Sequence, residues 1–583
     1  MNARWLLALL AGEAAGGTPA DSERSTARVE PFRSVWTRVS GNGYGILTFD
    51  SDRLTQAWEH VYQQYDPTTP TYDLLYDSYF GYSGLDGSGN WLTDPAEVRV
   101  EPGSGIITSI QVIGDLEFTQ YAFMPITFEG WGVAQVTRVR NASDSARTNE
   151  FQINSLHNYK PGGSETVATY DAERVTERGS YATLYYRAPG AIEATCEGAY
   201  EMVLAGRNIA GDCSGYMSDA VPSFGWNVPS LGPGEEYWAS VFTSQSPSPA
   251  WDLLESAPRD WLLAELAAWA GVQARVVLPP GLNEDESAVF RQQIAYFRMV
   301  QSRELGAAFG QIPASFPVAA PVEEFPHTWA ITWVRDSTYS IVALAGAGFA
   351  DEAVDALAFL FQPEKAGEYA SYVGDLNYGI SVARLYGDGT EWSDDDGTGP
   401  NIELDGWGSF LWAFDEAWSA IGADDTLTEL APRALDEVAD PLVAMISAEN
   451  GLITADSSIW ERHWNGNQKQ FAYTSIMAVA GLRAAGNIAE RLGDSRADSY
   501  RLHAESIADA IAEHLVDGDG VLAGSLEELQ AGIGYLDISA VEAYNMDVLD
   551  PRSETFGPTL EMWDAWLRVE TGTGYMRNDD GSA

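Results

Sequence analysis

The chain has 583 residues with 85 acidic and 33 basic side chains, which gives a formal net charge of −52. A chain of this length is expected to fold as two or more domains, and it contains no apolar run long enough to cross a membrane. Because phosphate binding needs a basic surface, the acidic balance argues against nucleic acid as a partner and indicates a strongly solvated surface.

The first 29 residues are predicted to form a signal sequence or a disordered leader. Arg4 precedes a short apolar run from Trp5 to Leu10, and small residues come next, which is the pattern of a secretory signal. We therefore expect a secreted or periplasmic protein. The apolar run is short and Glu13 interrupts the small residues after it, so an unexported protein is the alternative.

Residues 30–256 are predicted to form a β-sandwich. The pattern there has period two and is broken by Gly, Asn, Asp and Pro, as in the alternating run Leu116, Phe118, Gln120, Ala122 and Met124. Many short strands at such intervals are typical of a sandwich. Residues 257–282 are predicted to be a helical linker, with a helix over 260–274 that ends before Pro279-Pro280-Gly281.

Cys196 and Cys213 are the only cysteines, and they lie close together within the predicted strands. In an exported protein they would form a disulfide, and the alternative is a pair of buried thiols. Two cysteines with no nearby histidine do not close a zinc site, so no metal is expected here.

From residue 283 the hydrophobic period becomes that of a helix. Asn283 and Glu286 are predicted to form a capping pair ahead of an apolar face. Further helices are predicted near 336–349, 351–363, 405–421, 426–447, 469–492, 495–516, 537–548 and 553–569. The predicted fold class is therefore multidomain β plus α, with an antiparallel β-sandwich followed by many paired helices over 283–583.

Glu461 is the candidate catalytic residue that the local sequence indicates. It follows Trp460 on a loop before a helix whose apolar row is Ile476, Ala480, Ala484, Ile488 and Leu492. A carboxyl group flanked by aromatic side chains can be desolvated enough to stay protonated and to act as an acid. The alternative is a loop carboxylate that pairs with Arg462 or with a helix end.

Four stretches of the helical region carry a resemblance to a known family. They are Gln311-Ile312-Pro313-Ala314-Ser315 with Thr332-Trp333-Val334-Arg335-Asp336-Ser337; Leu404-Asp405-Gly406-Trp407-Gly408; Trp460-Glu461; and Leu536-Asp537 with Asp550-Pro551-Arg552 and Gly574-Tyr575-Met576-Arg577. In their order and spacing, residues 283–583 resemble the glucoamylase-like inverting glycoside hydrolases of family 15, bacterial type. That resemblance implies an (α/α)6 barrel behind the β-sandwich.

The resemblance also implies roles for individual residues. Glu461 would be the general acid that protonates the leaving oxygen. The implied substrate-binding residues are Trp333, Arg335, Asp336, Asp405, Trp460 and Arg577. Arg335 and Asp336 would grip the terminal glucose, for which a guanidinium group and a carboxylate are suited, and Arg577 would line the neighbouring sugar site. The tryptophans would offer apolar ring faces to the sugar.

The implied function is that of an exo-acting inverting α-glucosidase, which hydrolyses terminal α-linked glucose from α-glucans. Its partner would be an α-glucan or oligosaccharide, bound by a monomer without a cofactor. Two alternatives stay open: a non-catalytic or vestigial carbohydrate-binding member of the family, and a related enzyme that acts on α-1,6-glucan or trehalose. The sequence of the loops that determine substrate specificity does not distinguish between these alternatives.

The sequence departs from the family pattern at several positions. Glu403 stands where the family usually has glutamine, and Trp329 replaces a tyrosine often found there. His463 stands two residues after the predicted acid and is interpreted as a loop histidine without a catalytic part. Asp394-Asp395-Asp396-Gly397 suggests calcium by its carboxylate density, but it lacks the spacing of a calcium loop, so a solvated acidic loop is favoured.

The predicted mechanism also needs a second carboxylate that activates water. In the family this base lies beyond the Gly-Tyr-x-Arg stretch, whereas this chain stops six residues after Arg577. Asp579 and Asp580 are poor substitutes because a terminal segment does not hold a water molecule rigidly. We therefore expect a C-terminally truncated family member whose base lies beyond residue 583.

Overall fold

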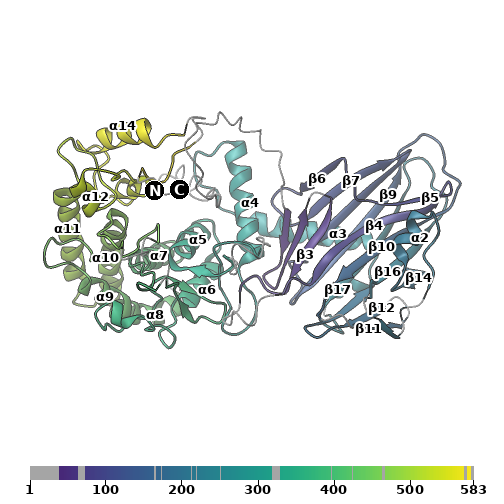
Figure 1. Cartoon of the computed structure of the whole chain (residues 1–583), viewed down its shortest axis with the longest axis horizontal. Helices are drawn as coiled ribbons and strands as arrows, with labels where there is room; N and C mark the ends of the chain where they lie inside the picture. The colour runs from purple at the N-terminus through teal and green to yellow at the C-terminus, as the bar shows by residue number, and fades with distance from the viewer. Residues whose placement is uncertain are drawn as a thin grey trace. The chain divides into compact units, whose positions relative to one another are not determined.

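A computed structural model describes residues 38–50, 52–63, 72–162, 166–171, 174–211, 213, 215–217, 220–249, 251–317, 329–395, 397–422, 424–461, 467–569 and 574–579. The predicted leader and His463 lie outside these residues. The described chain forms two compact units, one rich in strands and one helical (Figure 1). The strand-rich unit holds 38–305, 315–317 and 329–330, and the helical unit holds Gly306–Ala314 and residues from Ile331 onwards.

The strand-rich unit is an antiparallel β-sandwich, as predicted. One sheet has eight strands in the order β1-β2-β3-β4-β10-β16-β14, with β5 paired to β4, and the other has nine in the order β15-β11-β12-β13-β17-β9-β8-β7-β6. The strands are β1 (Arg38–Gly41), β2 (Ile46–Asp50), β3 (Arg53–Trp58), β4 (Leu75–Leu85), β5 (Ser88–Trp91), β6 (Glu97–Val100), β7 (Ile107–Ile113), β8 (Leu116–Phe123), β9 (Gly132–Asn141), β10 (Phe151–Tyr159), β11 (Thr166–Asp171), β12 (Arg174–Arg178), β13 (Thr183–Arg187), β14 (Glu193–Thr195), β15 (Gly215–Met217), β16 (Ser223–Val228) and β17 (Glu236–Ser244).

The predicted alternation in β8 places its apolar side chains in the core between the sheets. Leu116, Phe118 and Ala122 belong to the largest buried apolar cluster of this unit. Gln120 shares their period, and its amide accepts from Phe80 N at 3.0 Å and donates to Leu92 O at 3.0 Å. A polar side chain is tolerated there because its hydrogen bonds are made within the protein.

Two helices cover part of the sandwich, α3 (Pro258–Arg275) and α4 (Glu284–Val300). The predicted capping box of α4 is present, because the side chains of Asn283 and Glu286 each accept from the other residue's backbone N–H. Met299 of α4 packs in one apolar cluster with Trp269 of α3. The helical domain was predicted to start at residue 283, whereas α4 packs within the sandwich unit and the helical unit starts at Gly306.

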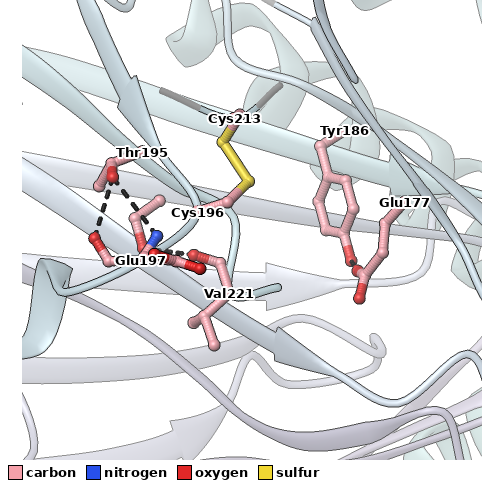
Figure 2. Close-up of a disulfide and its surroundings, with 8 residues drawn as sticks. Glu177, Tyr186, Thr195, Cys196, Glu197, Cys213 and Val221 are labelled. Atoms are coloured by element: carbon pink, nitrogen blue, oxygen red, sulfur yellow. Dashed lines mark hydrogen bonds between the residues drawn. A yellow bond between two sulfur atoms is a disulfide. The ribbon is translucent and has the colours of Figure 1, made fainter. Parts of the chain in front are cut away.

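The two cysteines are joined in a disulfide, which closes a segment that includes helix α2 (Ala199–Leu204). Figure 2 shows Cys196 directly after Thr195, at the end of β14, and bonded to Cys213. Val221 N donates to Cys196 O at 2.9 Å, so the disulfide and the backbone both tie this excursion to the sheet. Of the two alternatives that the sequence left open, the disulfide is therefore the one found.

The helical unit contains helices near the predicted ranges in chain order, one helix that was not predicted, Leu526–Ala531, and three two-residue strands. Its elements are β18 (Thr332–Trp333), α5 (Val334–Gly346), α6 (Ala350–Leu360), β19 (Arg384–Leu385), β20 (Glu391–Trp392), α7 (Asp405–Ile421), α8 (Asp425–Ala434), α9 (Asp440–Ala444), α10 (Ala472–Leu492), α11 (Ala497–His514), α12 (Leu526–Ala531), α13 (Glu542–Asn545) and α14 (Phe556–Trp566). In the part of the chain that the structure describes, no helix is both long and apolar enough to span a membrane.

The helix predicted over 426–447 is divided by a π-helical turn, Leu435–Ala439. Pro441 has no N–H group to donate to the carbonyl of Glu437, four residues earlier. Gly379 N donates to that carbonyl instead, at 2.8 Å. The widened turn is thus the local consequence of Pro441. The carbonyl that this proline leaves without a helical donor accepts from Gly379 in another part of the fold.

Helices α5, α7 and α10 are buried on most of their surface, whereas α11 buries only the stripe of Tyr500, Ala504, Ile507, Ala510 and Ile511. The buried helices α7 and α10 cross at two glycines. A Cβ on Gly408 would lie 2.3 Å from Met477 O, and a Cβ on Gly481 would lie 2.5 Å from Gly408 O. Only glycine permits this approach, which brings the N-terminal ends of neighbouring helices together.

Candidate active site

The polar residues predicted for the site lie at or just before the N-terminal ends of the buried helices. Trp333 ends β18 directly before α5, and Asp405 is the first residue of α7. The Trp460–Glu461 loop precedes α10. Segments more than a hundred residues apart in the sequence therefore contribute to one group of side chains.

The three-stranded sheet β18-β19-β20 positions Arg384 between two tryptophans. Arg384 is the register partner of Trp333 on one side and of Trp392 on the other. Its guanidinium lies over both rings, 4.6 Å from the centroid of Trp333 and 4.7 Å from that of Trp392. Two aromatic faces hold this cation in one orientation.

Glu461 is held at both carboxylate oxygens. Trp333 Nε1 donates to Oε1 at 2.9 Å, and Arg384 Nη2 donates to Oε2 at 2.8 Å. Arg384 also pairs with Asp394, the first residue of the predicted acidic loop. The side chain of Glu461 is 30% exposed, so the carboxylate is both fixed and accessible.

The loop that carries Glu461 is anchored by hydrogen bonds of Asp456. The buried carboxylate of Asp456 accepts from Leu404 N at 2.9 Å and from Thr474 Oγ1 at 3.0 Å, which joins the loop to the starts of α7 and α10. Ser458 and Glu461 have φ values of 50° and 54°, a left-handed conformation that is costly for residues other than glycine. Such strain persists where surrounding contacts overdetermine the backbone, and it gathers at functional sites.

Arg335 is the buried centre of a second cluster. Its Nη1 donates to Glu403 Oε2 at 2.6 Å and to Asp405 Oδ2 at 3.2 Å, and Asn401 Nδ2 donates to Glu403 Oε1 at 2.6 Å. Burial raises the pKa of Glu403 and that of Asp405, against the attraction of the guanidinium. Asp405, predicted to bind substrate, is fully buried and instead fixes Arg335.

Asp336 is the accessible member of this cluster. Its side chain is 46% exposed and lies 3.7 Å from Arg335 Nε, although the residues on both sides of it in the chain are buried. Desolvation by the surrounding protein raises the pKa of Asp336, and the charge of Glu461 adds to the rise. An accessible carboxylate therefore lies beside Arg335, close enough to Glu461 for the charge of Glu461 to influence its pKa.

A third group consists of Trp460, Asp537 and Arg577. Trp460 Nε1 donates to Asp537 Oδ2 at 2.6 Å, and the Arg577 guanidinium lies 5.2 Å from the centroid of the Trp460 ring. Ile538 N donates to Arg577 O at 3.0 Å, which brings the distant residue 577 to this place. The structure thus brings together Trp460 and Arg577, two predicted substrate-binding residues, and places Asp537, which was not among them, against Trp460.

The pH dependence of stability should report on Asp537. Burial raises its pKa to about 6, so the folded protein keeps a proton that the unfolded chain loses near pH 4. Stability therefore falls as the pH rises from about 4 to 6, by up to about 1.4 kcal/mol per pH unit. In Asp537→Asn this loss is absent. Urea unfolding at several pH values would show the free energy of unfolding of the variant rising relative to that of the parent between about pH 4 and 6. An equal pH dependence in the two proteins would contradict the raised pKa of Asp537.

The sequence did not indicate Arg384 or Asp456 as site residues. Arg384 belongs to a two-residue strand, and its position depends on pairing with residues 333 and 392, which no local pattern reveals. Among the described residues, no group of three or more His, Cys, Asp or Glu side chains is arranged to hold a metal ion. The chemistry available is that of fixed carboxylates, guanidinium groups and aromatic faces, which suits a neutral polyhydroxylated substrate.

Comparisons with known proteins bear on the family and the fold of this chain. Residues 291–573 match the family described as Glycosyl hydrolases family 15. A bacterial glucoamylase whose crystal structure contains acarbose is similar over 93% of this chain and 80% of its own, with 13% identity and a TM-score of 0.62. A putative kojibiose phosphorylase from the human microbiome is similar over 85% of this chain and 69% of its own, with 9% identity and a TM-score of 0.50.

At such identities the structural matches show the fold alone, and they confirm the predicted β-sandwich followed by a helical domain of the glucoamylase type. No curated protein matches the sequence. The family match covers Arg335, Asp336 and Glu461. Residues 291–573, just under half of the chain, therefore match the family of glycosyl hydrolases family 15.

Proposed function

We propose that the protein is an exo-acting inverting α-glucosidase of glucoamylase type, which releases terminal glucose from α-glucans with Glu461 as the general acid. The observation that carries the proposal is the fixed, accessible carboxylate of Glu461, held by Trp333 and Arg384. The accessible carboxylate of Asp336, 3.7 Å from Arg335 Nε, supports a sugar-binding position at this pair. The acarbose bound to the bacterial glucoamylase supports a saccharide substrate.

In this proposal the protonated Glu461 gives its proton to the glycosidic oxygen as the bond to the anomeric carbon breaks. A water molecule attacks that carbon from the opposite face and loses its proton to a base that is not among the residues assigned here. The donors Trp333 Nε1 and Arg384 Nη2 then stabilise the carboxylate that remains. Because the guanidinium of Arg384 is held between two rings, it needs no rearrangement during the step. The negative charge that Glu461 acquires when it loses its proton is thus stabilised by two donors that are already in place.

Recognition of the terminal glucose is assigned to Arg335 and Asp336. The accessible carboxylate of Asp336 accepts from sugar hydroxyl groups, and the buried partners Glu403 and Asp405 hold the guanidinium of Arg335 in place. Trp460 and Arg577 are assigned to the neighbouring sugar position, where the ring supplies an apolar face. We also propose export and a monomer, and the Cys196–Cys213 disulfide supports an oxidising compartment.

The experiment is incubation of the purified protein with maltotriose, isomaltotriose or trehalose, with products followed by proton NMR. The proposal predicts glucose release from maltotriose, with β-glucose appearing before mutarotation. Faster release from isomaltotriose or trehalose would favour the α-1,6-glucan or trehalose alternative. Binding of all three without glucose release would refute a hydrolase and favour a non-catalytic carbohydrate-binding protein.

A further inference from the structure

A hollow of about 420 Å³ lies on the outer face of the eight-stranded sheet of the sandwich. Its floor includes Asp77 and Tyr79 of β4 and Asn158 of β10, and Tyr200 of α2 belongs to its wall. All of these residues belong to the sandwich unit, so the hollow is separate from the residues assigned to catalysis. A volume of this size holds a short oligosaccharide.

The strand register places the floor residues together. Asp77 and Tyr79 are two residues apart on β4 and therefore share one face of the sheet, and Asn158 is the register partner of Asp77. The opposite face of β4 carries Phe80 and Tyr82, which fill the core of the sandwich. Polar side chains thus face outwards by the same alternation that buries the apolar ones.

The wall is built by the disulfide-closed segment between Cys196 and Cys213 (Figure 2). Helix α2 in this segment packs on the sheet through Ala199 and Val203, which join a buried cluster with Tyr79 and Trp91. A wall tied by a disulfide keeps the hollow open without a ligand, which lowers the entropic cost of binding.

One aromatic ring is available to a ligand. Tyr200 is 46% exposed and stacks on Trp91 with ring centroids 6.0 Å apart. One ring face is therefore supported by the protein while the side chain lines the hollow. A supported aromatic face is suited to the apolar C–H face of a sugar ring.

The polar side chains around the hollow are partly accessible. The side chain of Asp77 is 23% exposed, and Asn158 is half-buried. Arg53 lies over the Tyr79 ring, and its Nη1 is 3.6 Å from Asp77 Oδ2. With Glu201 also in the lining, charges of both signs are present, which favours a neutral hydroxyl-rich ligand over an anion.

We propose that this hollow is a second saccharide-binding site, which holds a short segment of an α-glucan on the sandwich. The choice of an α-glucan rests on the proposed function, whereas the preference for a neutral saccharide rests on the hollow alone. Tyr200 stacks against a sugar ring, and Asp77 with Asn158 and Arg53 bonds its hydroxyl groups.

The test is calorimetric titration of maltotriose into the full-length Glu461→Gln variant, in which turnover is suppressed. We expect two sites per chain. Adding Tyr200→Ala should weaken one of them by about fivefold, the loss of one aromatic contact, and adding Asp77→Ala should weaken the same site by about tenfold. Adding Tyr76→Ala, which removes an exposed tyrosine of β4 outside the hollow, should change neither site.

Binding of maltotriose at no site that Tyr200→Ala weakens, whether the parent shows one site or two, would overturn the proposal. Tyr200 is exposed, so its variant is expected to fold even if Asp77→Ala does not. In the protein with Glu461 intact, Tyr200→Ala should leave the hydrolysis rate of maltotriose unchanged. A protein without turnover that still binds maltotriose at a Tyr200-dependent site would refute the proposed hydrolase and keep this inference.

Discussion

Replacing Glu461 by glutamine is expected to lower glucose release from maltotriose by about two to four orders of magnitude, the usual contribution of a general acid. Glutamine has nearly the same shape but no acidic proton. Its single amide oxygen can accept from only one of the two donors, Trp333 and Arg384, that the carboxylate satisfies together. The measurement is the initial rate of glucose release at saturating substrate.

The matched control is Glu505→Gln. Glu505 is an exposed glutamate of α11 that pairs with Arg483, so its loss removes an equal charge and an ion pair away from the site. Its rate should equal that of the parent. Maltotriose affinity at the catalytic site should change little in Glu461→Gln, and a variant that lost binding as strongly as turnover would indicate a substrate-holding role instead.

Replacing Arg335 by methionine is expected to lower the free energy of unfolding by about 3–5 kcal/mol, since it leaves buried charges without a partner. Glu403 and Asp405 both bond its Nη1, and both carboxylates are fully buried or nearly so. Urea unfolding, followed through the transition of the helical unit, measures the loss. A loss below about 1 kcal/mol would show that Glu403 and Asp405 become protonated, and therefore uncharged, when the arginine is removed.

A combined variant separates stability from recognition. Adding Glu403→Gln and Asp405→Asn to Arg335→Met removes the orphaned charges, so much of the lost stability should return. Glucose release should not return, because the proposed grip on the terminal glucose needs the guanidinium beside Asp336. Recovery of both properties would contradict a direct role for Arg335 in holding the sugar.

The fold class could be predicted from the sequence, and the candidate site residues could be proposed from it, because those features have local signals. Periods of two and of about four residues separate strands from helices, and Arg335, Asp336 and Glu461 stand in short motifs at helix starts. The predicted helix over 537–548 consists only of a 3-10 turn, Ile538–Val541, and the short α13. Periodicity over one or two turns does not distinguish these conformations.

Other features depend on tertiary pairing and leave no local signal. The motif around Asp405 indicated the site, but whether its carboxylate faces a ligand or a buried arginine is decided by how α7 packs against α5. Arg384 is placed by strands of two residues each. Trp460 meets Asp537 across 77 positions of the sequence, a contact that arises only in the folded chain.

The proton that Glu461 is proposed to give to the leaving group is tested most directly by comparing two leaving groups. Maltotriose needs protonation of its departing oxygen, whereas fluoride leaves α-glucosyl fluoride without help from an acid. We predict that Glu461→Gln loses at least about a hundredfold in rate on maltotriose but less than about tenfold on α-glucosyl fluoride. Equal losses on the two substrates would contradict the assignment of Glu461 as the acid.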